Sequence, residues 1–209
     1  MLKLLTRSMR GQRPAPVWRA RLAVECLEAR NCPSAPEITL TVTIVDHPNR
    51  IVRLSGTVTD ENPATVAISF SGAVLGSATP DSSGRYSVDF QAETLGTVYA
   101  EAVDEEWLTD VASAQVASQA PVISDFAAVW LFGNVWKFRG RVTDEHAVGL
   151  GVLLGGIPSL RGVTATVNSD GWFEATVELA PDEEGTVTAQ TWDWWDLESN
   201  VAEALIRQP

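Results

Sequence analysis

Three indole rings and two carboxylates lie close together in the segment TWDWWDLESN, from Thr191 to Asn200. The rings belong to Trp192, Trp194 and Trp195, and the carboxylates to Asp193 and Asp196. Indole faces can stack on pyranose rings while Asp193, Asp196, Gln190 or Asn200 bond the hydroxyls. Trp is also enriched at the hot spots of protein interfaces. The segment is therefore a candidate binding site for a polysaccharide or a protein, and burial of its rings against neighbouring loops is the alternative.

Acidic side chains form a second candidate site. Ca²⁺ takes several carboxylate and carbonyl oxygens from flexible loops. In one half of the chain Asp60, Glu61, Asp104 and Glu105 could supply them, and in the other half Asp144, Glu145, Asp193 and Asp196. No D-x-D-x-D-G ladder is present, so turn capping and solubility remain the alternative role of these residues. No other cofactor is expected.

The residue types give little support to catalysis. The chain has only two cysteines, Cys26 and Cys32, and only two histidines, His47 and His146, which we expect in separate loops. A lone loop histidine is usually a solvated side chain, and two histidines make a His-based zinc site improbable. We therefore predict that the protein is not an enzyme.

Charge is distributed unevenly along the chain. The first 34 residues hold seven of the 15 basic residues and two of the 27 acidic ones, which leaves 8 basic and 25 acidic residues in the remainder. A surface this acidic repels phosphate backbones, so we expect no nucleic-acid partner. It favours solubility, cations or basic partners.

Residues 1–34 are predicted to be a basic leader, mostly disordered. They lack the apolar run of a secretory signal, and no segment of the chain is long and apolar enough for a transmembrane helix. The end of this segment, with Leu27, Glu28, Arg30 and Pro33, resembles the L-E-x-R leader of predicted exported proteins of planctomycete bacteria. The resemblance implies a secreted or cell-surface protein; a basic tail on a cytoplasmic protein is the alternative.

The rest of the chain contains two copies of one module. Leu54–Glu61, LSGTVTDE, recurs as FRGRVTDE at Phe138–Glu145, and SGRY at Ser83–Tyr86 recurs as DGWF at Asp170–Phe173. GTVYA at Gly96–Ala100 recurs as GTVTA at Gly185–Ala189. Because strands are kept while loops take insertions, this pattern predicts two domains at about residues 35–118 and 119–209.

Apolar residues alternate with a period of two in both copies, which is typical of half-buried strands. Val52, Leu54 and Val58 share one face in the first copy, and Trp136, Phe138 and Val142 share the matching face in the second. About seven short strands in about 85 residues predict an immunoglobulin-like sandwich. The expected fold class is all-β, with two tandem immunoglobulin-like Greek-key β-sandwiches.

These motifs, G-T-V-T-D-E, S-G-x-[YW] and V-x-A-x-A-x-D, resemble those of bacterial immunoglobulin-like, or cadherin-like, repeats. The resemblance implies non-catalytic modules that act as spacers, adhesion units or display arms on exported proteins. It depends on order and spacing, because Asp104-Glu-Glu-Trp-Leu and Asp193-Trp-Trp-Asp-Leu replace the common D-x-x-G-N turn.

The strand phase also predicts where the tryptophans point. Trp136 should be core, Trp172 and Trp192 should face solvent, and Trp194 and Trp195 should lie in a turn, with Trp107 as their counterpart in the first copy. Three roles remain open for the cluster: capping its own sandwich, docking on the other copy or a partner protein, and stacking on a sugar. We expect a surface protein for adhesion, protein interaction or spacing, with polysaccharide binding and calcium-dependent adhesion as alternatives. The sequence leaves the oligomeric state open.

Overall fold

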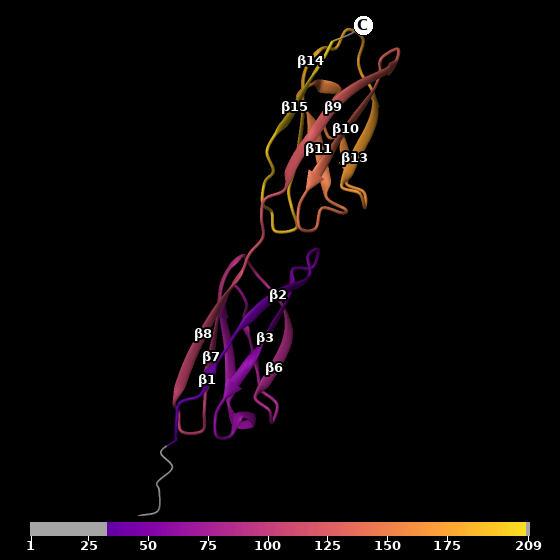
Figure 1. Cartoon of the computed structure of the whole chain (residues 1–209). Coiled ribbons are helices and arrows are strands. Elements are labelled where there is room, and N and C mark those ends of the chain that lie inside the picture. Colours follow the sequence, from indigo (N-terminus) through magenta and orange to yellow (C-terminus); the bar gives the residue numbers. More distant parts are fainter. Residues whose placement is uncertain (1–32, 208–209) are drawn as a thin grey trace, which may run out of the picture. The chain divides into compact units, whose positions relative to one another are not determined.

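The computed structural model describes residues 33–207, and the regular elements of this part are strands and two short 3₁₀ turns. The strands form two β-sandwiches, coloured indigo to magenta and orange to yellow in Figure 1. The predicted all-β fold is confirmed. The predicted leader, with Cys26 and Cys32, lies outside the described residues apart from its last two positions.

The first sandwich consists of two facing sheets. One has the order β1-β3-β2, with β6 also paired to β3, and the other has the order β5-β4-β7-β8. The elements are β1 (Glu37–Ile38), β2 (Thr41–Asp46), β3 (Ile51–Thr59), η1 (Pro63–Thr65), β4 (Ala67–Gly72), β5 (Gly76–Ala78), β6 (Arg85–Gln91), β7 (Gly96–Val103) and β8 (Thr109–Val116).

The second sandwich repeats this arrangement. One sheet has the order β13-β10-β9 and the other β12-β11-β14-β15. The elements are β9 (Val122–Phe132), β10 (Val135–Thr143), β11 (Gly151–Gly155), η2 (Pro158–Leu160), β12 (Thr164–Thr166), β13 (Trp172–Glu178), β14 (Gly185–Thr191) and β15 (Ala202–Ile206). All the pairings are antiparallel. Together with the order of the strands in the two sheets, this gives both copies the topology of an immunoglobulin-like Greek key.

The repeated sequence motifs meet across the strands. Gly56 of the first G-x-V-T-D-E motif pairs with Tyr86, and Gly140 of the second pairs with Phe173. In both copies a glycine therefore lies opposite a large aromatic ring. A Cβ at Gly140 would lie 2.6 Å from Cζ of Phe173, so the bare backbone makes room for the ring.

Each sandwich has its own hydrophobic core, and the alternating residues predicted to face inward supply most of it. Val52, Leu54 and Val58 are buried in the first cluster. Trp136 and Phe138 are buried in the second, as expected. Trp172 and Trp192 are 40% and 39% exposed, which confirms their predicted outward direction. In residues 33–207 no helix is long and apolar enough to cross a membrane.

Candidate functional site: the joint between the sandwiches

The Trp-rich segment forms a tight loop after β14. Asp193 organises it, because its Oδ1 accepts hydrogen bonds from the amides of Trp195 (2.8 Å) and Leu197 (2.7 Å). The amide of Asp193 donates in return to the carbonyl of Leu197 (3.0 Å). Asp196 takes a positive φ of 64°, which short polar residues tolerate better than most. We call Asp193–Leu197 the docking loop.

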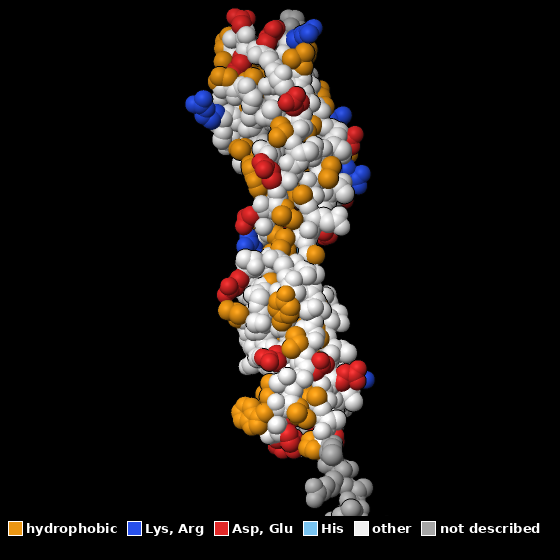
Figure 2. Space-filling model, turned by 90° about the vertical axis from the view of Figure 1, so that its left-hand side faces the viewer, with side chains coloured by type: hydrophobic (Ala, Val, Ile, Leu, Met, Phe, Trp, Pro, Cys, Tyr) orange, Lys and Arg blue, Asp and Glu red, His pale blue; other side chains and the backbone are white. Residues whose placement is uncertain are grey.

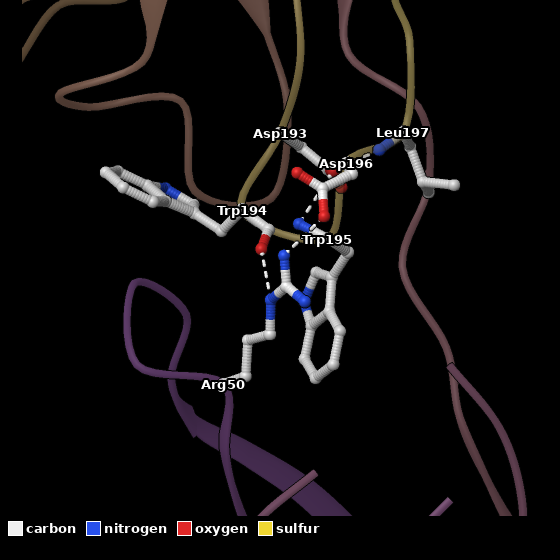
Figure 3. A network of polar contacts seen from close by, with 6 residues as sticks. All are labelled: Arg50, Asp193, Trp194, Trp195, Asp196 and Leu197. Carbon is white, nitrogen blue, oxygen red and sulfur yellow. Dashed lines mark hydrogen bonds and ion pairs between the residues drawn. The ribbon is translucent and has the colours of Figure 1, made fainter. Parts of the chain in front are cut away.

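The docking loop contacts the turn between β2 and β3 of the first sandwich (Figure 3). Arg50 Nε donates to the main-chain carbonyl of Trp194 (2.7 Å), and its Nη2 donates to Asp196 Oδ2 (2.6 Å). The guanidinium also lies 5.7 Å from the centre of the Trp195 ring, within the range of a cation–π contact. One arginine thus contacts three consecutive residues of the other sandwich.

Trp195 is 7% exposed and belongs to the hydrophobic cluster of the first sandwich, although it comes from the second copy. Leu197 packs against the same cluster. Trp194 instead packs against the core of the second sandwich, and its Nε1 donates to the carbonyl of His146 (3.1 Å). The interpretation in which the turn caps only its own sandwich is therefore wrong for Trp195, which docks on the other copy.

The two histidines meet in the same region. The rings of His47 and His146 are parallel to within 4°, with their centres 5.0 Å apart, and His146 lies 6.4 Å from the Trp194 ring. The two histidines come from separate loops, as expected, and both are half-buried, but their rings stack on each other instead of standing alone. His47 and Arg50 lie in the same turn of the first sandwich. Both therefore contact the second sandwich at this joint.

The segment between the sandwiches is held by acidic residues that we considered as calcium ligands. Ser118 Oγ donates to Asp193 Oδ2 (3.1 Å), and the amide of Gln119 donates to Glu145 Oε1 (2.9 Å). The first sandwich repeats the second contact, because the amide of Ser34 donates to Glu61 Oε1 (3.1 Å). A hydrogen bond from its own amide lowers the pKa of Glu61, and the hydroxyl and amide of Ser34 lower it further.

Three aspartates at these sandwich ends keep one carboxylate oxygen without a partner. Oδ2 of Asp60, Asp104 and Asp144 is buried and accepts no hydrogen bond, while each Oδ1 accepts a nearby amide. Asp104 is only 8% exposed. Burial, followed by the charges of Glu145 and Asp193, raises the pKa of Asp144 above its ordinary value. An ordered water or a cation could supply the missing partner of such an oxygen.

The remaining predicted metal ligands do not gather around these oxygens. Glu105 is exposed, and Asp196 is committed to Arg50. Within residues 33–207, no group of three or more His, Cys, Asp or Glu side chains is placed to hold a metal ion. A cation here would therefore need main-chain carbonyls and water as well as carboxylates.

The five tryptophans predicted to bind a ligand do not share one surface. Trp107 is 83% exposed, Trp172 and Trp192 are about 40% exposed, and Trp195 is buried. Trp172 lines a hollow of about 300 Å³ with Arg139, Asn168 and Glu174. A sugar stacked on Trp192, Trp194 and Trp195 together would lack the Trp195 face, which the first sandwich covers.

Acidic side chains outnumber basic ones in the part of the chain from residue 35 onward. Figure 2 shows many more acidic than basic side chains on the face in view. Ion pairs in the described part of the chain include Arg50 with Asp196, Arg53 with Asp89 and Lys137 with Glu174. Among these, Arg50 alone connects the two sandwiches, and sequence reasoning did not identify it.

Comparison with known proteins shows similarity at the level of solved structures alone. No protein-family model and no curated protein matches the sequence. The fibronectin(III)-like modules of Clostridium thermocellum CbhA are 15% identical over 80% of this chain and 93% of that chain, with a TM-score of 0.33. The D0-D1 domain of intimin is 18% identical over 81% and 98%, with a TM-score of 0.31.

Invasin, described as a bacterial integrin-binding protein, is 15% identical over 83% of this chain and 40% of that chain, with a TM-score of 0.35. Scores and identities this low do not assign a function to this chain.

Proposed function

We propose that this protein is a non-catalytic, exported module protein in which two immunoglobulin-like sandwiches act as a spacer and interaction unit at the cell surface. The observation that carries the proposal is the joint. A buried tryptophan, two hydrogen bonds from one arginine and a bonded connecting segment lie in this joint, and we expect them to restrict the motion of one sandwich on the other. A spacer needs such restriction, because a freely hinged pair cannot hold a loop at a defined distance.

The test measures the stiffness of the joint. Spin labels at Ser113 and Glu203, both exposed strand residues, report the distance between the sandwiches by double electron–electron resonance, after Cys26 and Cys32 are replaced by serine. We expect a narrow distance distribution that broadens in Arg50→Ala. The matched control is Arg53→Ala, which removes an arginine ion pair inside the first sandwich. A distribution that is broad from the outset would contradict the spacer role.

Export is tested separately. In the native cells, the full chain should be accessible to protease added outside, and deletion of residues 1–32 should leave it inside. If the chain lacking residues 1–32 were still cleaved by the added protease, these residues would not be needed for export. Protection of the full chain would remove the surface location.

Calcium binding is a second candidate, favoured by the unpartnered carboxylate oxygens. Asp60 and Asp104 follow β3 and β7, at the end of the first sandwich where Ile38 pairs with Val58 and donates to Asp110 (3.0 Å). A hard cation there would neutralise buried charge and complete its shell from main-chain carbonyls and water.

Differential scanning calorimetry tests this candidate. Millimolar Ca²⁺ should raise the melting temperature relative to EDTA, because a ligand of the native state stabilises it by mass action. The rise should disappear in Asp104→Asn and persist in Glu101→Gln, an exposed strand carboxylate. No rise in the wild type would exclude calcium binding at these positions and would leave the spacer proposal intact.

A further inference from the structure

The joint has repeat-related counterparts elsewhere in the chain. The first sandwich carries its own version of the docking loop, Asp104–Leu108, which we call the Trp107 loop. Asp104 Oδ1 accepts the amide of Leu108 at 2.7 Å, as Asp193 Oδ1 accepts that of Leu197. Trp107 has a φ of 65°, against 64° for Asp196. The two loops therefore share one backbone conformation.

The Trp107 loop differs from the docking loop in being uncovered among the described residues. Trp107 aligns with Asp196, so its indole comes one residue later in the loop than that of Trp195. The side chain of Trp107 is 83% exposed. Leu108, in the place of Leu197, is 37% exposed. Exposed tryptophan next to exposed leucine, in a backbone conformation that bulky residues avoid, is typical of a contact surface.

The second sandwich carries the counterpart of the turn that receives the docking loop. In the first sandwich β2 and β3 pair Val42 with Leu54, and in the second β9 and β10 pair Ala128 with Phe138. The β9–β10 turn is shortened to Gly133-Asn134, so it has no equivalent of the His47–Arg50 segment. By antiparallel pairing this turn lies at the end of the second sandwich opposite its docking loop.

Four consecutive apolar residues stand exposed beside that turn. They form what we call the aromatic hairpin, with exposed fractions of 39% for Val129, 46% for Trp130, 38% for Leu131 and 66% for Phe132. Phe132 takes the place of Asp46, the polar last residue of β2. Trp130 Nε1 donates to the carbonyl of Gly133 (2.8 Å), so its ring is held in position before any contact forms.

We propose that the Trp107 loop of one copy of this protein docks on the aromatic hairpin of a second copy. The occupant is inferred from the joint, where this chain already seats a loop of the same backbone beside a turn at the corresponding strand positions. In place of the Arg50 ion pair, the aromatic hairpin presents aromatic and aliphatic side chains, and the Trp107 loop presents Trp107 and Leu108 beside the exposed Glu105 and Glu106. The contact is heterologous and leaves one loop and one hairpin free, so association is open-ended. This inference does not depend on the spacer function.

Charge predicts how this association responds to salt. The chain from residue 35 onward has 25 acidic and 8 basic residues, so two copies repel each other. At about 0.15 M ionic strength the screening length is about 8 Å, and it shortens as salt is added. Added salt should therefore strengthen this self-association. An association held together by opposite charges would instead weaken as salt is added.

Sedimentation velocity of the full chain, under reducing conditions and over a series of salt and protein concentrations, provides the test. We expect species heavier than the monomer, increasing with concentration and salt. Trp107→Ser and Phe132→Ser should each weaken association about ten-fold or more, as expected when one hot-spot ring is lost. Trp172→Ser removes another exposed indole and should leave association unchanged.

Mixing the two variants makes the test specific. Trp107→Ser keeps the hairpin and Phe132→Ser keeps the loop, so the mixture should form a one-to-one dimer and nothing larger. Thermal melting by circular dichroism checks that both variants are folded. A wild-type monomer under all conditions, association that survives both substitutions, or a mixture that stays monomeric would each overturn the proposal.

Discussion

Trp107 has a main-chain φ of 65°, in the left-handed region that costs a bulky residue about 1–2 kcal/mol. Its ring is almost fully exposed, so little packing within the described residues offsets that cost. We expect Trp107→Gly to raise the free energy of unfolding of the monomer by up to about 1 kcal/mol. Urea denaturation at low protein concentration measures the effect. Destabilisation would instead show that the indole packs against the protein in solution.

Asp144 is predicted to make stability depend on pH. Burial raises its pKa in the folded protein above the ordinary value of an aspartate. As pH rises, the unfolded chain releases the proton first, so stability falls until the folded carboxyl has also ionised. Asp144→Asn should therefore stabilise the protein at neutral pH, by less than about 1 kcal/mol because solvent screens part of the charge. The advantage should vanish in acid.

Asp89 is the control, because its contribution to stability should depend on pH in the opposite direction. Arg53 lowers its pKa, first by hydrogen bonding, so the contribution of Asp89 to stability is present above the unfolded pKa and is lost in acid. Asp89→Asn should destabilise at neutral pH, and the difference from wild type should close as pH falls. Denaturation in EDTA at several pH values separates the two aspartates; equal pH profiles would refute the assignment for Asp144.

At the scale of strands, the glycines of the repeated motif set how closely aromatic rings approach the backbone. Gly140 in β10 faces Phe173 in β13, and an added Cβ would lie 2.6 Å from Cζ and 2.8 Å from Cε1 of that ring. Phe173 is 1% exposed and has little room to move. Gly140→Ala should therefore cost about 1–3 kcal/mol of stability, the usual cost of overpacking.

Two variants make that expectation specific. Gly151→Ala in β11 adds a methyl group that meets nothing within 4 Å, so it should be close to neutral. Phe173→Leu should destabilise the protein less when residue 140 is alanine than when it is glycine. The smaller side chain at position 173 leaves space for the added methyl group. Additive effects in this double-mutant cycle would mean that the two residues do not clash.

At the scale of the whole molecule, the stability of the first sandwich depends on a residue of the second. Trp195 belongs to the first hydrophobic cluster, so Trp195→Ala should cost about 3–5 kcal/mol, as for other large aromatic side chains in cores. Hydrogen exchange should show faster exchange in the first sandwich, most strongly near the Arg50 turn. Trp192→Ala, which removes an exposed ring, is the control. Unchanged exchange near Arg50 would contradict the joint.

Much of the fold could be predicted from the sequence, because the spacing of apolar residues along a strand shows which side chains face the core. Val52 and Leu54 alternate with polar neighbours and are both fully buried. Trp192 continues the phase of Thr188 and Gln190 and faces solvent, as predicted. The two copies, compared with each other, also located the loops after β7 and β14. These features are local or repeated, so they can be read without knowledge of distant contacts.

The site could be predicted only in part, because the residues that form it lie in turns. A turn has no period of two, so nothing in TWDWWDLESN indicates that Trp194 packs inward on its own sandwich while Trp195 enters the other. The arginine that contacts them is 144 residues distant from Trp194 in the sequence. His47 and His146 lie far apart in the sequence, and the same contact between sandwiches stacks their rings.

The sequence by itself determined the strands, the duplication and the acidic surface, since these follow from side-chain spacing and composition. The tertiary structure alone decided which tryptophan is buried, which aspartate oxygens lack a partner and which arginine connects the sandwiches. The physical reason is that burial of a turn side chain depends on which surface the rest of the chain brings against it. That surface is formed only when residues distant in sequence come together.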